Sequence, residues 1–208
     1  MDGVTPLRGN EKWCSAKLLG SLMCSTKDIL KRCTLGNVAF QSFSKVWLNS
    51  RIPLVKKLKV YEAQVISVIM YNCSSWAAPD IVMKKLDICH RKHLRKIMNV
   101  RWPCSMMSNN TLYRRCESKP LSERVKMSRW KMLGHVLRSP ENSPAHSSLC
   151  FAVDAMKKLT GRKGRHRINL LHQLKKDLLE RGYVFETYEN IVQLRQVASD
   201  RLFWRNLF

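Results

Sequence analysis

We begin with His135, whose imidazole could act as a catalytic base, a metal ligand or a phosphate contact. It follows a lone glycine in the stretch SRWKMLGHVLRS (128–139). On a helical projection one broad arc is apolar, made by Trp130, Met132, Leu133, Val136 and Leu137. The opposite side holds Lys131, His135 and Arg138. Because no carboxylate or cysteine lies at helical contact distance from His135, a catalytic base and a metal ligand both lack their partners. Two interpretations of His135 remain open: a solvated surface residue, and a contact to a phosphate or sugar. The absence of a side chain at Gly134 predicts that a neighbouring backbone or helix approaches closely there.

A second chemical pair is Cys89 and His93, which are four residues apart on one predicted helix face. Both could reach one zinc ion, with Cys104 and Cys116 as further ligands. Structural zinc sites usually show two closely spaced pairs, whereas this second pair is separated by twelve positions. A packed core face of Cys and His is the alternative, so Cys89 and His93 stand only as candidate metal ligands and we expect no cofactor.

Catalytic motifs are not apparent in the sequence. We find no GxSxG elbow, no P-loop and no GxGxxG. Asp177 and Glu180 are the nearest approach to a carboxylate pair, and their spacing is typical of a solvated helix face. We therefore expect this chain not to be an enzyme and to take no small-molecule substrate.

The charge of the chain indicates a polyanionic partner. Lys and Arg total 38 against 15 Asp and Glu, a formal net charge of +23. The longest apolar run, 65–71, is far below the about 20 residues that span a bilayer, and the N-terminus lacks the order of a secretory signal. We expect RNA or DNA rather than a membrane, a nuclear or cytoplasmic location, and reduced cysteines.

The basic residues gather in three kinds of segment: the ridge of a helix at 80–99, the helix that holds His135, and the loop KKLTGRKGRHR (157–167). One such segment is usually a solvated face, but several of them in a chain of charge +23 favour phosphate binding. Trp102 and Tyr113, each beside arginine, are candidates for base stacking. The predicted nucleic-acid contacts are Lys84, Lys85, Arg91, Lys92, Arg95, Lys96, Arg101, Arg114, Arg115, Lys131, His135, Arg138, Arg162, Lys163, Arg165 and Arg167.

Helices must position nearly all of these residues. In the helix at 80–99 the apolar arc comprises Val82, Leu86, Cys89, His90, His93, Leu94 and Ile97. Further helices are predicted at 27–47, after Pro53, at 109–116, from Pro120, at 168–181 and at 188–207, where Leu202 joins the apolar stripe. Strand character is confined to 12–23, and SPENSPAHSS (139–148) is predicted as a loop. The fold class is mainly α: helical bundle units with a short N-terminal strand or hairpin.

Eight motifs in order resemble the C-terminal part of the reverse transcriptase of non-LTR (LINE-type) retrotransposons. They are KLLGS, AFQSFSKVW, YNCSSW, HRKHLRKIMNVRWP, SNNTLYRRC, PLSERVKMSRWKMLGHVLR, GRKGR and DRLFWRNL. Each motif alone is unspecific, but their order spans nearly the whole chain. The resemblance implies palm-like strands at 1–25, a thumb-like helical domain at 26–105 and a basic helical nucleic-acid-binding region at 106–208.

In that family the thumb holds the template and primer duplex, so the resemblance implies that Lys84, Arg91, Lys92 and Arg95 track a nucleic-acid backbone. The family's catalytic aspartates lie upstream of the matched segment, so we expect no polymerase activity from this chain, with an upstream palm as a further partner. The expected function is binding of RNA or an RNA:DNA duplex with little sequence specificity. The alternatives are a retained restriction-like endonuclease, a basic ribosome-associated protein, and a transposon relic, which the divergent YNCSSW would fit.

Overall fold

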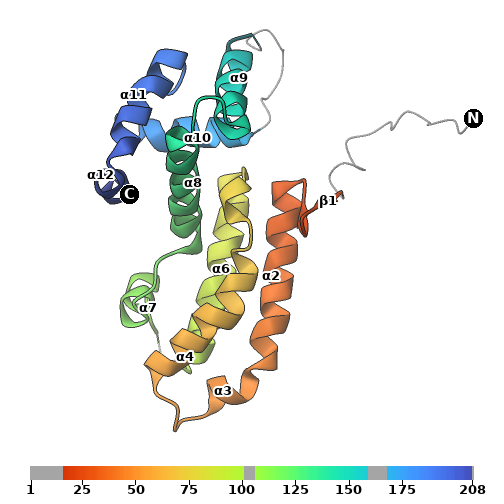
Figure 1. Ribbon diagram of the computed structural model, residues 1–208. Coiled ribbons are helices and arrows are strands. Elements are labelled where there is room, and N and C mark those ends of the chain that lie inside the picture. Colours follow the sequence, from red (N-terminus) through yellow and green to blue (C-terminus); the bar gives the residue numbers. More distant parts are fainter. Residues whose placement is uncertain (1–15, 101–105, 159–167, 208) are drawn as a thin grey trace, which may run out of the picture. The chain divides into compact units, whose positions relative to one another are not determined.

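The computed structural model describes residues 16–100, 106–158 and 168–207, without the side chains of 156–158 (Figure 1). The described chain divides into two units, the first formed by 16–72 and 78–122 and the second by 73–77 and 123–207. Within the described residues helices dominate both units and strands are confined to one short N-terminal hairpin, so the predicted mainly α fold is confirmed.

The hairpin consists of β1 (Lys17–Leu18) and β2 (Ser21–Leu22), paired antiparallel. Leu19 and Gly20 make its two-residue turn with φ values of 47° and 83°, both left-handed, as a type I′ turn requires. Side chains of the first unit fix the turn from outside: Tyr71 donates a hydrogen bond to Leu19 O (2.9 Å) and Arg32 to Gly20 O (2.8 Å). Of the predicted strand region 12–23, the structure describes residues 16–23, and within these the strands comprise four residues.

The first unit is a bundle around α2 (Ser25–Ser42). This helix packs against α6 (Asp80–Ile97) and against a continuous segment formed by α4 (Leu54–Tyr61), the π-helical turn η1 (Glu62–Ile66) and α5 (Ser67–Ile69). Gly36 is where α2 and α5 meet, because a Cβ there would strike the Ile69 side chain. The short α3 (Ser44–Leu48) closes one end of the unit with the buried Trp47.

The remaining helix of the first unit is α7 (Asn109–Arg115), which packs on α6. Its start is capped by the Ser108 hydroxyl, which accepts a hydrogen bond from Thr111 N (3.1 Å). A helix at 109–116 was predicted, and the structure confirms it within one residue.

The second unit begins with the 3₁₀ turn η2 (Cys73–Ser75) and continues with α8 (Leu121–Arg138), whose residues from Glu123 onward belong to it. Its other helices are α9 (Pro144–Lys158), α10 (Leu170–Leu179), α11 (Tyr188–Ser199) and α12 (Arg201–Asn206). They share one apolar core, made by Trp130, Leu133, Leu137, Val153, Leu174, Leu178, Phe185, Ile191, Leu194, Ala198 and Trp204.

Two predictions of secondary structure in the second unit are wrong. SPENSPAHSS is a loop only in its first half, because Pro144 starts α9 at the first helical position, where a missing N–H costs nothing. The expected helix over 188–207 is two helices. The Asp200 carboxylate accepts hydrogen bonds from Leu202 N and Phe203 N (2.9 Å each) and starts α12 in a new direction. As a result Leu202 is exposed and Trp204 takes the core position.

Candidate nucleic-acid interface

The α6 helix separates a core face from a basic face, as its periodicity predicts. All seven residues of the predicted apolar arc are buried. The opposite side, here called the α6 basic face, comprises Lys84, Lys85, Arg91, Lys92, Arg95 and Lys96. The four lysines are exposed and the two arginines half-buried. None of these six side chains forms an ion pair with a carboxylate of the described residues.

The two arginines of the α6 basic face hold α7 in place. Arg95 donates to Asn109 Oδ1 (2.7 Å) and Arg91 to the Tyr113 hydroxyl (3.5 Å). Burial raises the pKa of Tyr113, so this phenol stays protonated and neutral beside the guanidinium groups. Arg91 and Arg95 were predicted from the sequence as nucleic-acid contacts; in the structure they also have a structural role, because they hydrogen-bond to α7. The four lysines are therefore the cations best placed to meet a ligand.

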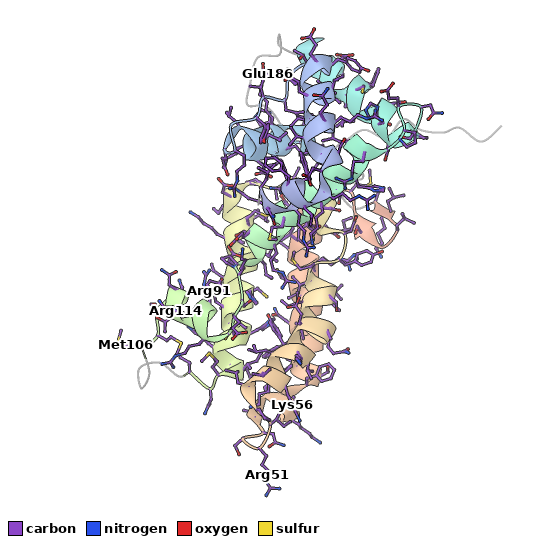
Figure 2. The ribbon with its side chains drawn as sticks, turned by 60° about the vertical axis from the view of Figure 1, so that its left-hand side comes forward. Arg51, Lys56, Arg91, Met106, Arg114 and Glu186 are labelled. Atoms are coloured by element: carbon purple, nitrogen blue, oxygen red, sulfur yellow. The ribbon has the colours of Figure 1, made fainter. Side chains whose placement is uncertain are left out.

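The predicted arginines of α7 are exposed. Arg114 and Arg115 lie in its last turn, where cations also interact favourably with the helix dipole. Figure 2 shows Arg114 and Arg91 on the same side of the first unit, next to α7. The same figure shows Arg51 and Lys56 at a different end of this unit, where α3 joins α4. Tyr113, a predicted stacking residue, is half-buried with its ring 5.9 Å from that of His90, so only part of it can meet a base.

Beneath the α6 basic face a buried hydrogen-bond chain fixes the rotation of α6. The Tyr61 hydroxyl lies between two imidazoles, 2.9 Å from Nδ1 of His90 and 3.2 Å from Nδ1 of His93. The outer nitrogens are also partnered: Nε2 of His93 lies 2.8 Å from Asn37 Oδ1 and Nε2 of His90 lies 3.0 Å from Ser118 Oγ. All four contacts are satisfied when both rings are neutral.

The protonation states of His90 and His93 follow from their hydrogen-bond partners and from the burial of His93. Since Asn37 Oδ1 accepts, His93 carries its proton on Nε2 and accepts from the Tyr61 hydroxyl through Nδ1. His90 then donates from Nδ1 to the same oxygen and accepts from Ser118. Burial, and secondarily the charge of Lys96, lowers the pKa of His93 to about 4. His93 is thus a neutral core residue at physiological pH.

The proposed zinc ligands Cys89 and His93 are occupied by protein partners. The Cys89 thiol contacts Asn37 Oδ1 (3.4 Å), the same oxygen that His93 contacts. A hydrogen bond with Cys33 lowers the pKa of Cys89 and raises that of Cys33. Cys116 contacts Met98 Sδ (3.3 Å), and Cys104 lies outside the described residues. Within the described part of the chain no three His, Cys, Asp or Glu side chains come together as metal ligands.

In the second unit the structure separates the two faces of α8 much as the projection predicts. Trp130, Leu133 and Leu137 are buried, whereas Lys131 and His135 are exposed and Arg138 is half-buried. Gly134 lies against the Trp204 indole, which would collide with a Cβ at that position. The predicted close approach at Gly134 is thereby confirmed, and its partner is a helix that the sequence patterning did not resolve.

The remaining predicted contacts, Arg101, Arg162, Lys163, Arg165 and Arg167, lie outside the described residues, as does Trp102. Asp177, assigned from its sequence to a solvated face, is instead buried: its Oδ2 accepts from Arg129 Nε (3.1 Å) and Nη2 (2.7 Å). Arg129 also donates to Trp76 O (3.2 Å). This buried pair joins α8 to α10, which the helical pattern alone did not predict.

Among the described residues no helix is long and apolar enough to cross a membrane.

Comparison of the chain with models of protein families, with curated proteins and with solved structures gave no match.

Proposed function

We propose that this chain binds RNA or an RNA:DNA duplex through its phosphates, with the α6 basic face as the principal surface. The observation that carries the proposal is the row of exposed lysines on α6 with no carboxylate partner among the described residues. Lys84 and Lys96 are separated by twelve residues, or about 18 Å at 1.5 Å per residue. That length matches several successive phosphates of a nucleic-acid strand.

The chemistry of the face supports binding with little sequence specificity. Lysine ammonium groups act as point charges and contact phosphates without reading bases. The buried chain of Tyr61, His90 and His93 fixes the rotation of α6, so the lysines are presented as one surface.

The same proposal includes the parent class. The chain would be a non-catalytic part of a non-LTR retrotransposon reverse transcriptase, with α6 in the thumb, an upstream palm as a protein partner, and a nuclear or cytoplasmic location. The motif order, from KLLGS to DRLFWRNL, supports this assignment. The helical bundle of the first unit is compatible with it.

The salt dependence of binding tests the proposal. A variant with Lys84, Lys85, Lys92 and Lys96 each changed to Gln leaves Arg91 and Arg95 to hold α7. A control variant with Lys45, Arg51, Lys56 and Lys59 each changed to Gln has the same net charge and removes exposed cations of α3, α4 and the loop between them. Both keep a helix-forming side chain at every helical position changed.

Binding to a short RNA:DNA duplex is measured by fluorescence anisotropy over a series of salt concentrations. For four lost phosphate contacts the slope of log K against log salt becomes shallower by roughly 3 to 4 in the α6 variant. The control variant should keep a slope close to that of the wild type. Equal slopes in the two variants, or salt-independent binding by the wild type, would overturn the proposal.

A further inference from the structure

The second unit contains a basic pocket of ≈ 870 Å³ between α8 and α12. Its cationic and imidazole side chains are Lys131, His135, Arg138, Arg201 and Arg205. The first three come from the polar side of α8, and the two arginines come from α12, one turn apart. The pocket is of the size that takes a nucleotide-sized ligand.

The floor of the pocket is rigid. Trp130 and Trp204 stack with ring centroids 4.0 Å apart and an interplanar angle of 4°. Each indole donates to the other residue's backbone: Trp130 Nε1 to Trp204 O (2.9 Å) and Trp204 Nε1 to Trp130 O (3.2 Å). Gly134 provides the space that the Trp204 ring occupies. The cationic side chains therefore lie on two helices, α8 and α12, that reciprocal hydrogen bonds hold together.

The charge of the pocket is not neutralised from within. Its described lining includes no Asp or Glu. The nearest acids in sequence are engaged elsewhere: the Asp200 carboxylate caps α12, and Glu141 pairs with Arg195 (3.0 Å). Burial, and secondarily repulsion from Arg201, lowers the pKa of Arg138, although Arg138 also donates to Ala198 O (2.9 Å). An anion in the pocket would offset this repulsion between like charges.

We propose that this pocket binds the phosphate groups of a single-stranded RNA or DNA segment. Arginine suits this ligand because its planar fork donates two parallel hydrogen bonds to phosphate oxygens. His135 adds a donor at the rim, and two helices bearing separate arginines can hold neighbouring phosphates of one strand. The inference rests on the proposed function only for the choice of a nucleic-acid strand over a free nucleotide as the source of the phosphates.

The test uses the full chain and a variant with Lys131, Arg201 and Arg205 each changed to Gln. Arg138 is kept, because its bond to Ala198 O joins α8 to α11. The matched control has Lys45, Arg51 and Lys56 each changed to Gln. The indole N–H signals of Trp130 and Trp204 report directly on the floor of the pocket by NMR, independently of the α6 basic face.

A short single-stranded RNA should shift both indole signals in the wild type and in the control, and leave them in place in the pocket variant. The slope of log K against log salt for this RNA should become shallower by about 2 in the pocket variant, since three contacts to a single strand are lost. Inorganic pyrophosphate and a nucleoside triphosphate are titrated in parallel.

Shifts with the RNA that the pocket variant loses support the inference. Shifts with the nucleoside triphosphate but not with the RNA overturn the assignment to a strand. Identical behaviour of the pocket and control variants with every probe overturns the site altogether. If that result occurs while the α6 variant still loses duplex binding, the pocket fails and the proposed function stands; if duplex binding is also unaffected, both fail.

Discussion

The neutral state of His93 predicts a specific loss of stability in mild acid. The imidazole is enclosed by Phe40, stacked at 4.1 Å, and Tyr61, edge-on at 5.7 Å, and only 5% of the residue is exposed. Protonation would place a proton on Nδ1, where the Tyr61 hydroxyl now donates, and would leave that hydroxyl hydrogen without its acceptor. The folded state therefore resists protonation of His93.

The magnitude follows from the two pKa values. In the unfolded chain the pKa of His93 takes its ordinary value of 6.5, whereas in the folded chain it is about 4. The unfolded state binds the proton first, so stability is fully present above the unfolded pKa and falls as the pH drops from 6.5 toward 4. At about 1.4 kcal/mol per pH unit the full effect is about 3 kcal/mol, of which about 2 kcal/mol is lost by about pH 5.

The assay is urea denaturation of the wild type and of His93→Gln at neutral pH and in mild acid. The variant loses the packing of the imidazole ring and is less stable at neutral pH. The part of its free energy of unfolding that depended on the protonation of His93 is absent, so its stability should fall less in mild acid than that of the wild type. His172→Gln, which removes an exposed imidazole, controls for the substitution itself. The reasoning would be refuted if the free energy of unfolding had the same pH dependence in the wild type and in His93→Gln. It would also be refuted by an NMR titration in which His93 of the folded chain protonates near pH 6.5.

Two further predictions concern the second unit, each read from the midpoint of chemical denaturation followed by tryptophan fluorescence. In Gly134→Ala the added methyl group meets the Trp204 indole, so the free energy of unfolding should fall by about 1 to 3 kcal/mol; a midpoint equal to that of the wild type would contradict this prediction. Asp177→Ala leaves the Arg129 guanidinium buried without its carboxylate and should cost about 3 to 5 kcal/mol; a loss below about 1 kcal/mol would show that Arg129 finds another partner.

The α6 helix shows how much a strongly periodic segment reveals. Seven apolar or neutral residues at helical spacing predicted its core face, and all seven are buried. The opposite cations were predicted as one ridge because nothing local distinguishes them. The hydrogen bonds from Arg91 and Arg95 to α7 depend on where a second helix packs, and so could not be read from the pattern of α6 alone.

The sequence pattern was insufficient to predict where a helix changes its register and where it changes its direction. In the helix predicted after Pro53, Val55 is 65% exposed while Ile66, eleven residues later and therefore on the same side of a regular α-helix, is buried. Val55 lies in α4, whereas Ile66 is the last residue of the π-helical turn η1, whose wider winding shifts the helical register, so one helical projection cannot describe both residues.

The basic pocket was missed for a similar reason. Its α8 half was predicted, but Arg201 and Arg205 were placed on a helix assumed to continue from residue 188 to 207. The break at Asp200 turns α12 toward α8 and exchanges Leu202 for Trp204 in the core. An Asp two residues before an apolar pair is a helix-start signal, and reading it as a cap would have divided the segment correctly.

Lysine footprinting tests the central claim, the role of the α6 basic face, most directly. The full chain is treated with an amine-acylating reagent with and without an RNA:DNA duplex, and the extent of modification is measured at each lysine by mass spectrometry. Lys45, Lys56 and Lys59 serve as exposed internal controls outside α6. We predict that the duplex protects Lys84, Lys85, Lys92 and Lys96 and leaves the three controls reactive. Protection of the controls without protection of the α6 lysines, or equal protection of both sets, would contradict the account.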